Sequence, residues 1–153
     1  MKDDKYFLRF AIDLAKQARE MGDEPFGAIL VKDGQIVMKG KNQISTGSDP
    51  THHAELGLVR DFCKQNKTSD LSDYTLYTSC EPCCMCSGAM VWAKLGRMVY
   101  SVTHEQLAKI AGDNIMVGTD YVFSHSPHAP EVVGPLLNEE GLAVFDGYTF
   151  AYI

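Results

Sequence analysis

The sequence lacks a long apolar stretch, a low-complexity tract and an internal repeat. Its longest apolar runs, such as residues 26–31, are far shorter than the roughly 20 residues that a transmembrane helix needs. Residues 1–5 are mostly charged, and no apolar segment of the kind found in a secretory signal follows them. We therefore predict a soluble, cytoplasmic protein with no membrane partner.

An excess of positive charge is also missing. The chain has 14 Lys and Arg against 20 Asp and Glu, a formal net charge of −6 and a pI near 5.3. Because Lys and Arg supply most of the nonspecific affinity for phosphate backbones, this balance disfavours nucleic acid as a partner and favours a small molecule.

A full set of paired cysteines is excluded as well, since the chain has five cysteines, an odd number. Cys83, Cys84 and Cys86 lie within four residues, where local geometry disfavours disulfides among them. This cluster indicates metal binding better than it indicates oxidation.

The length and composition indicate one globular domain over residues 1–153. A chain of this size buries about two thirds of its unfolded surface, which supports a core without disulfides. Its 45% hydrophobic and 22% charged residues are ordinary for a folded domain.

The hydrophobic pattern alternates between helix and strand periods. After residue 74, strands and helices alternate, which predicts parallel strands in a mixed sheet with helices on both faces, whereas the first two strands form an antiparallel hairpin. We predict helices at 4–21, 51–64, 82–93 and 104–111, and strands at 25–31, 35–40, 74–79, 97–102 and 141–148. We predict a loop over 42–50 and mostly loop over 112–141.

Two short motifs carry the chemistry. Cys83 and Cys86, three residues apart in the first turn of a helix, point the same way, and the positive helix end favours their thiolates. His53, near the start of another helix, can bring an imidazole to the same point, giving a Cys₂His zinc site with an open fourth position. Glu55 is placed to move protons between water and a leaving amine.

An H-x-E motif followed by P-C-x-x-C is the signature of zinc-dependent base deaminases. The sequence resembles the cytidine and deoxycytidylate deaminase superfamily over nearly its whole length. Within it, the chain is similar to bacterial guanine deaminases and to tRNA-specific adenosine deaminases. The resemblance includes the first helix, 25–28, the loop around Asn42, 49–55 and 75–83.

The resemblance implies a three-layer α/β/α sandwich around a five-stranded mixed sheet, with His53, Cys83 and Cys86 as zinc ligands and Glu55 as the catalytic proton shuttle. It also implies substrate contacts. These would be Asn42, Phe26, the backbone of Ala54, and either Asp113 or Asn114. Family members are dimers or larger, so the resemblance implies a homodimer.

The function expected from these observations is hydrolytic deamination of a free purine such as guanine, in purine metabolism. Zinc-bound hydroxide would attack the amino-bearing carbon and Glu55 would pass protons to the base, so that ammonia leaves. The alternatives are adenosine-to-inosine deamination of tRNA, deamination of cytosine or cytidine, and a non-catalytic, zinc-stabilised interaction domain. A closed structural site would instead use Cys80, Cys84 or His52 as a fourth ligand.

Three histidines outside the motifs have simpler interpretations. We interpret His104 as an ordinary residue at a helix start or on the surface, and His125 and His128 as loop residues.

Overall fold

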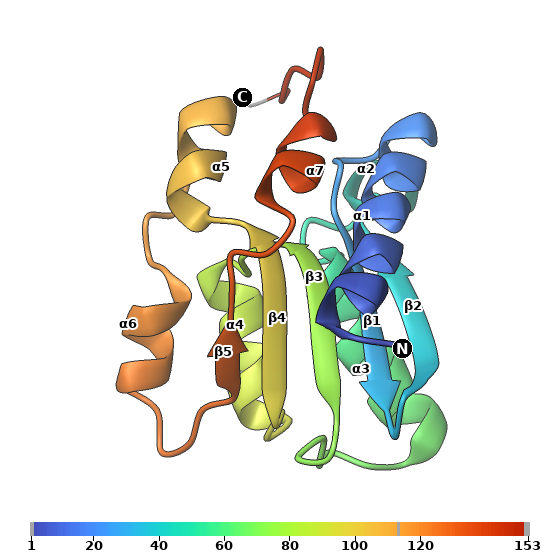
Figure 1. The fold of residues 1–153 in the computed structure, drawn as a ribbon, viewed down its shortest axis with the longest axis vertical. Coiled ribbons are helices and arrows are strands. Elements are labelled where there is room, and N and C mark those ends of the chain that lie inside the picture. The colour runs from blue at the N-terminus through green and yellow to red at the C-terminus, as the bar shows by residue number, and fades with distance from the viewer. Residues whose placement is uncertain (1, 113, 152–153) are drawn as a thin grey trace.

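A computed structural model describes residues 2–112 and 114–151, which form one five-stranded sheet with helices packed against it (Figure 1). The strands are β1 (Gly27–Lys32), β2 (Gln35–Lys41), β3 (Thr75–Cys80), β4 (Arg97–Val102) and β5 (Glu131–Val133). The helices are α1 (Asp4–Glu20), α2 (Ile44–Gly47), α3 (Ala54–Asn66), α4 (Cys84–Trp92), α5 (His104–Ala111), α6 (Thr119–Ser124) and α7 (Asn138–Ala143).

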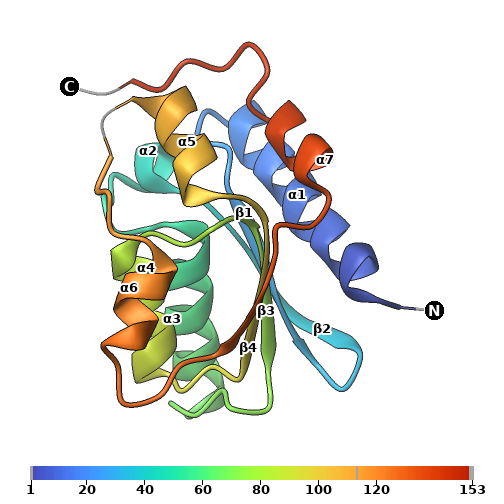
Figure 2. The same cartoon turned by 60° about the vertical axis from the view of Figure 1, so that its left-hand side comes forward.

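The sheet is mixed, with strand order β2-β1-β3-β4-β5. β1 is antiparallel to β2 and β3, whereas β3, β4 and β5 are parallel. Figure 2 shows α1 and α7 on one face and α3, α4 and α6 on the other. The predicted α/β/α sandwich is therefore confirmed. None of the helices over the described residues is long and apolar enough to span a membrane.

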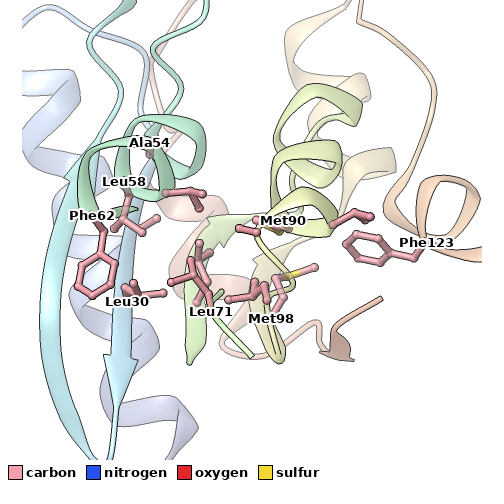
Figure 3. Close-up of a cluster of buried hydrophobic side chains, with 14 residues drawn as sticks. Leu30, Ala54, Leu58, Phe62, Leu71, Met90, Met98 and Phe123 are labelled. Atoms are coloured by element: carbon pink, nitrogen blue, oxygen red, sulfur yellow. The ribbon is translucent and has the colours of Figure 1, made fainter. Parts of the chain in front are cut away.

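Two cores lie on the two faces of the sheet because successive strand residues point to opposite sides. Leu30 of β1 packs with Leu58 of α3 and Met90 of α4 in the core shown in Figure 3. Its neighbour Ile29 packs with Leu8 of α1 in the other core. Burial on both faces explains why β1 reads as a continuous apolar run.

The C-terminal third differs from the sequence prediction. The stretch predicted as mostly loop, 112–141, contains α6 and β5, and the strand predicted at 141–148 is wrong because α7 ends at Ala143 and turns follow. These elements are only three to six residues long, too short for a clear hydrophobic period. Tertiary contacts hold them instead: Gly141 lies so close to Ser101 of β4 that a side chain there would clash.

A second local difference concerns the loop predicted at 42–50, which contains the short helix α2. Its N-cap residue provides no side-chain hydrogen bond. Asp23, which is distant in the sequence, caps the helix instead: its carboxylate accepts hydrogen bonds from the backbone N–H groups of Ser45 and Thr46, both at 2.9 Å. A long-range cap of this kind leaves no local sequence signal.

Candidate functional site

The two motifs occupy the N-termini of α3 and α4, which pack against each other. His53 is the N-cap residue of α3 and Glu55 lies in its first turn. Cys83 is the N-cap residue of α4, and Cys86 lies in its first turn. Both helices present their positive ends at this point, which stabilises thiolates and other anions.

The side chains of His53, Cys83 and Cys86 converge, with all three ligand atoms within 4.8 Å of one another. His53 Nδ1 lies 3.4 Å from Cys83 Sγ and 3.6 Å from Cys86 Sγ. Tetrahedral zinc, with Zn–S of about 2.3 Å and Zn–N of about 2.0 Å, would separate such atoms by about 3.6 Å. The donor set and its spacing thus fit zinc and leave one coordination position for a non-protein ligand.

The residues that could have supplied a fourth protein ligand do not join this group. Cys80, Cys84 and His52 are outside the group of converging ligand atoms. The imidazole of His52 packs over Gly57, where an added Cβ would lie 2.7 Å from its Nε2. Burial raises the pKa of the Cys80 thiol well above its usual value, which favours the neutral form over a ligating thiolate.

Electrostatics at the site favour both metal binding and proton transfer. The pKa of the Cys83 thiol is lowered, first by a hydrogen bond from the Cys86 thiol and further by His53. Glu55 is only 6% exposed, and burial raises the pKa of its carboxyl to about 7. A carboxyl that exchanges its proton near neutral pH has the property that general acid–base catalysis requires.

A cavity of about 340 Å³ opens over this group. His53, Glu55 and Cys83 contribute to its wall, as do Phe26 and Asn114, so the structure brings these five predicted site residues together. Much of the remaining wall is apolar. It includes Ile44, Pro50, Leu107 and Ile115.

Three other predicted site residues are buried beside this cavity without being part of its wall: Cys86, Asn42 and Ala54. Asn42 is 1% exposed; its backbone N–H donates to Phe26 O at 3.1 Å, and its Oδ1 accepts from Ile44 N at 3.0 Å. Its Nδ2 has no hydrogen-bond partner among the described residues. Asp113 lies outside the described residues.

Phe26 is held by aromatic residues from the end of the chain. Its ring lies 5.8 Å from that of Phe145 and 6.1 Å from that of Phe150, centroid to centroid. These contacts link the wall of the cavity to a C-terminal segment that has no regular secondary structure beyond α7. The sequence resemblance alone did not indicate this packing.

Three polar residues of the wall, Glu24, Glu81 and His104, were missed by the sequence interpretation. Glu24 precedes Pro25 and Phe26, and burial raises the pKa of its carboxyl. His104 begins α5 as predicted, but it is a wall residue only 5% exposed. A usable signal existed for His104, because it follows β4 directly and ligand sites of such sheets gather at the carboxyl ends of parallel strands. His125 and His128 lie outside this cavity.

Comparisons with known proteins agree with this geometry. The family model for the cytidine and deoxycytidylate deaminase zinc-binding region matches residues 1–102. Guanine deaminase of Bacillus subtilis (strain 168) is 42% identical over 112 residues, covering 72% of this chain and 72% of that protein. A probable cytosine deaminase of Schizosaccharomyces pombe is 35% identical over 151 residues, covering 95% of this chain and 91% of that protein.

A solved structure from studies of A-to-I editing by tRNA:A34 deaminases superposes with a TM-score of 0.79 at 30% identity. The match covers 92% of this chain and 99% of that chain. The three comparisons share a reaction type and differ in the substrates that their names give.

Proposed function

The chain belongs to the cytidine and deoxycytidylate deaminase family of zinc-dependent hydrolases, and we propose that it deaminates a free purine base, with guanine as the first candidate. The observation that carries this proposal is the small, largely apolar cavity with His53, Glu55 and Cys83 in its wall. Its volume of about 340 Å³ is in the range of small-molecule sites.

The proposed roles follow from the positions of the side chains. His53, Cys83 and Cys86 would hold zinc, which supplies the Lewis acidity that activates water as a nucleophile at neutral pH. Glu55 would take a proton from the attacking water and pass it to a ring nitrogen of the base. It would then take the proton of the newly added hydroxyl and pass it to the amine, which leaves as ammonia while the carbonyl forms. Its burial keeps bulk water from competing for that proton.

The rest of the wall, together with the buried residues Asn42 and Ala54 beside it, would bind the base. Phe26 and Leu107 offer apolar surface to a flat heteroaromatic ring. Asn42 Nδ2 would donate to a carbonyl or ring-nitrogen acceptor on the base, the backbone of Ala54 would contact it, and Asn114 would contact its edge. Asp113 remains the alternative to Asn114 in that last role.

Deamination of adenosine in tRNA is the second candidate, favoured by the similarity to the tRNA:A34 deaminase structure. The net charge of −6 argues against it, because a tRNA-binding surface needs clustered positive charge. Titrating tRNA at low and moderate salt separates the two, since a tRNA enzyme should lose affinity steeply as salt rises.

We further propose that residues 1–153 act as a single domain, in the cytoplasm and as a homodimer. The dimer is supported by Trp92, the sole tryptophan of the chain, which is 85% exposed at the end of α4. Tryptophan is enriched at protein–protein interfaces relative to the rest of protein surfaces. Sedimentation of wild-type protein and Trp92→Ala measures the assembly directly.

The deciding experiment is an ammonia-release assay of zinc-loaded protein with guanine, adenine, cytosine, their nucleosides and tRNA. We expect the highest kcat/KM on a free base, with guanine first, and loss of that activity in Glu55→Ala. Activity on tRNA alone would overturn the proposal in favour of the second candidate. Release of ammonia from none of these compounds would overturn both.

A further inference from the structure

His104 is a buried histidine whose ring forms no hydrogen bond with the described residues. Its side chain is 5% exposed and lines the same cavity as His53 and Glu55. Neither Nδ1 nor Nε2 has a hydrogen-bond partner among residues 2–112 and 114–151. Structural histidines in a core normally pair at least one ring nitrogen, because burying unpaired polar groups costs free energy.

Over the same residues, three buried side-chain polar atoms lack a partner, and they belong to a wall residue of this cavity and to a residue bonded to its wall. Two are the ring nitrogens of His104. The third is Nδ2 of Asn42. Other atoms of this residue, its backbone N–H and its Oδ1, form hydrogen bonds with the wall residues Phe26 and Ile44. Unsatisfied groups gathered at one cavity indicate that a ligand satisfies them.

The position of His104 is fixed by the metal-binding segment. Glu81 lies between Cys80 and Cys83, and its Oε1 accepts a hydrogen bond from the backbone N–H of His104 at 3.0 Å. Its Oε2 accepts from Thr119 Oγ1 at 2.7 Å. One carboxylate therefore connects the starts of α5 and α6 to the segment that carries the cysteines, which sets the imidazole at a defined place relative to the reacting centre.

We propose that His104 contacts the substrate and determines which base the cavity accepts. This inference rests on the proposed deaminase function. A neutral imidazole offers one N–H donor and one acceptor nitrogen, so it pairs with an edge of a heteroaromatic base that presents both an acceptor and a donor. A site built to hydrogen-bond such an edge rejects analogues that lack it, because its own buried groups would then stay unpaired.

The test compares His104→Phe, which keeps a ring of similar shape without nitrogen, with His104→Asn, which keeps one donor and one acceptor group. His125→Phe is the matched control, since His125 is exposed and lies outside the cavity. For each protein, zinc content, Tm, kcat and KM are measured with guanine and with cytosine. His104→Gln provides a further polar variant if His104→Phe does not fold.

We expect His104→Phe to raise KM for the preferred base at least about tenfold, the effect of one lost hydrogen bond, with kcat changed much less. Zinc content should stay at the wild-type level, His104→Asn should recover part of the loss, and His125→Phe should match wild type. If His104→Phe does not fold, His104→Gln should still raise KM.

Two results would overturn the inference, and only one of them would also overturn the proposed function. If wild-type protein is active and the folded His104 variants retain its KM and base preference, His104 is structural and the deaminase proposal stands. If wild-type protein releases no ammonia from any base, both the inference and the proposed function fail.

Discussion

The cavity wall has two halves, which come from different parts of the chain. Residues up to Val102, the end of β4, contribute His53, Glu55 and Cys83, and the family model matches this same stretch, 1–102. Residues beyond it contribute His104, Leu107, Asn114 and Ile115. Relatives named for guanine, cytosine and tRNA share the fold and the reaction type. With the function and the role of His104 proposed above, the first half would perform the reaction and the second half would select the base.

The two halves also differ physically. The chemical residues are at the starts of two helices that pack on the sheet, and such positions are rigid. The second half is built from α5 and the irregular stretch 114–118, where Ile115 is largely exposed. Substitutions in the first half should therefore affect every substrate, and substitutions in the second should affect substrates unequally.

The largest effect is expected from loss of the metal. Cys83→Ser should lose zinc and all measurable activity on every base, because one of the three proposed protein ligands is removed. Cys63→Ser, at a partly buried cysteine outside the ligand group, is the control and should keep both. Metal analysis with activity measured before and after chelation checks this, and zinc added back should restore the chelated wild type. A zinc-free Cys83→Ser protein with full activity would contradict the metal site.

Glu55→Gln should lower kcat by about 10²–10⁴ while zinc stays bound, since the proton shuttle is lost and the ligands remain. Glu105→Gln is a matched control, because Glu105 occupies the second position of α5 as Glu55 does in α3 but is exposed. Steady-state kinetics and metal content are measured together. Unchanged kcat in Glu55→Gln would remove Glu55 from the reaction.

Asn42→Ala should lower kcat/KM about tenfold for guanine and for cytosine alike, because it removes a buried donor that any base with a nearby acceptor can use. Asn66→Ala removes an amide that, within the described part of the chain, bonds only to Phe62 O on α3, so it should leave the kinetics unchanged. Equal kinetics for Asn42→Ala and Asn66→Ala would show that Asn42 only shapes its turn.

The smallest effect on activity is expected at Asp4, outside the cavity. Its carboxylate accepts two hydrogen bonds from Arg97, at 2.7 and 2.6 Å, and one from Tyr77 Oη at 2.8 Å. Asp4→Asn should reduce the free energy of unfolding by about 1–2 kcal/mol and leave kcat/KM unchanged. Urea unfolding measures the first quantity and steady-state kinetics the second.

This loss should depend on pH. Hydrogen bonding to Arg97 lowers the pKa of Asp4 in the folded state, so its stabilisation is complete above the unfolded pKa of about 3.9. It disappears as pH falls through the lower, folded pKa. The stability difference between wild type and Asp4→Asn should thus be constant near neutrality and shrink below about pH 4. A difference that grows in acid would contradict the role given to this ion pair.

The sequence predicted the first half of the molecule better than the second, for physical reasons. The long amphipathic helix α1 and the buried strands have clear periods. The motifs that carry His53, Cys83 and Cys86 combine residue types that are typical of a zinc site. The elements after residue 112 are short and depend on distant partners such as Glu81, so their pattern is weak.

His104 shows the limit most clearly. A lone histidine at a helix start is usually a surface residue. Its position directly after β4 is typical of ligand sites, but that position alone does not show that the side chain is buried in the wall of a cavity. The structure is needed to show that the side chain is buried and that both ring nitrogens lack a hydrogen-bond partner among the described residues. Glu24 was missed for a similar reason, since its neighbours Pro25 and Phe26 carried the recognisable pattern.

One half of the cavity wall would perform the reaction and the other would select the base. The most direct test of this division is the ratio of kcat/KM for guanine to that for cytosine, measured in Glu55→Gln and in His104→Phe. We predict that Glu55→Gln lowers both values by the same factor and keeps the ratio, whereas His104→Phe changes the ratio about tenfold with zinc retained. A ratio that shifts in Glu55→Gln and stays constant in His104→Phe would contradict the account.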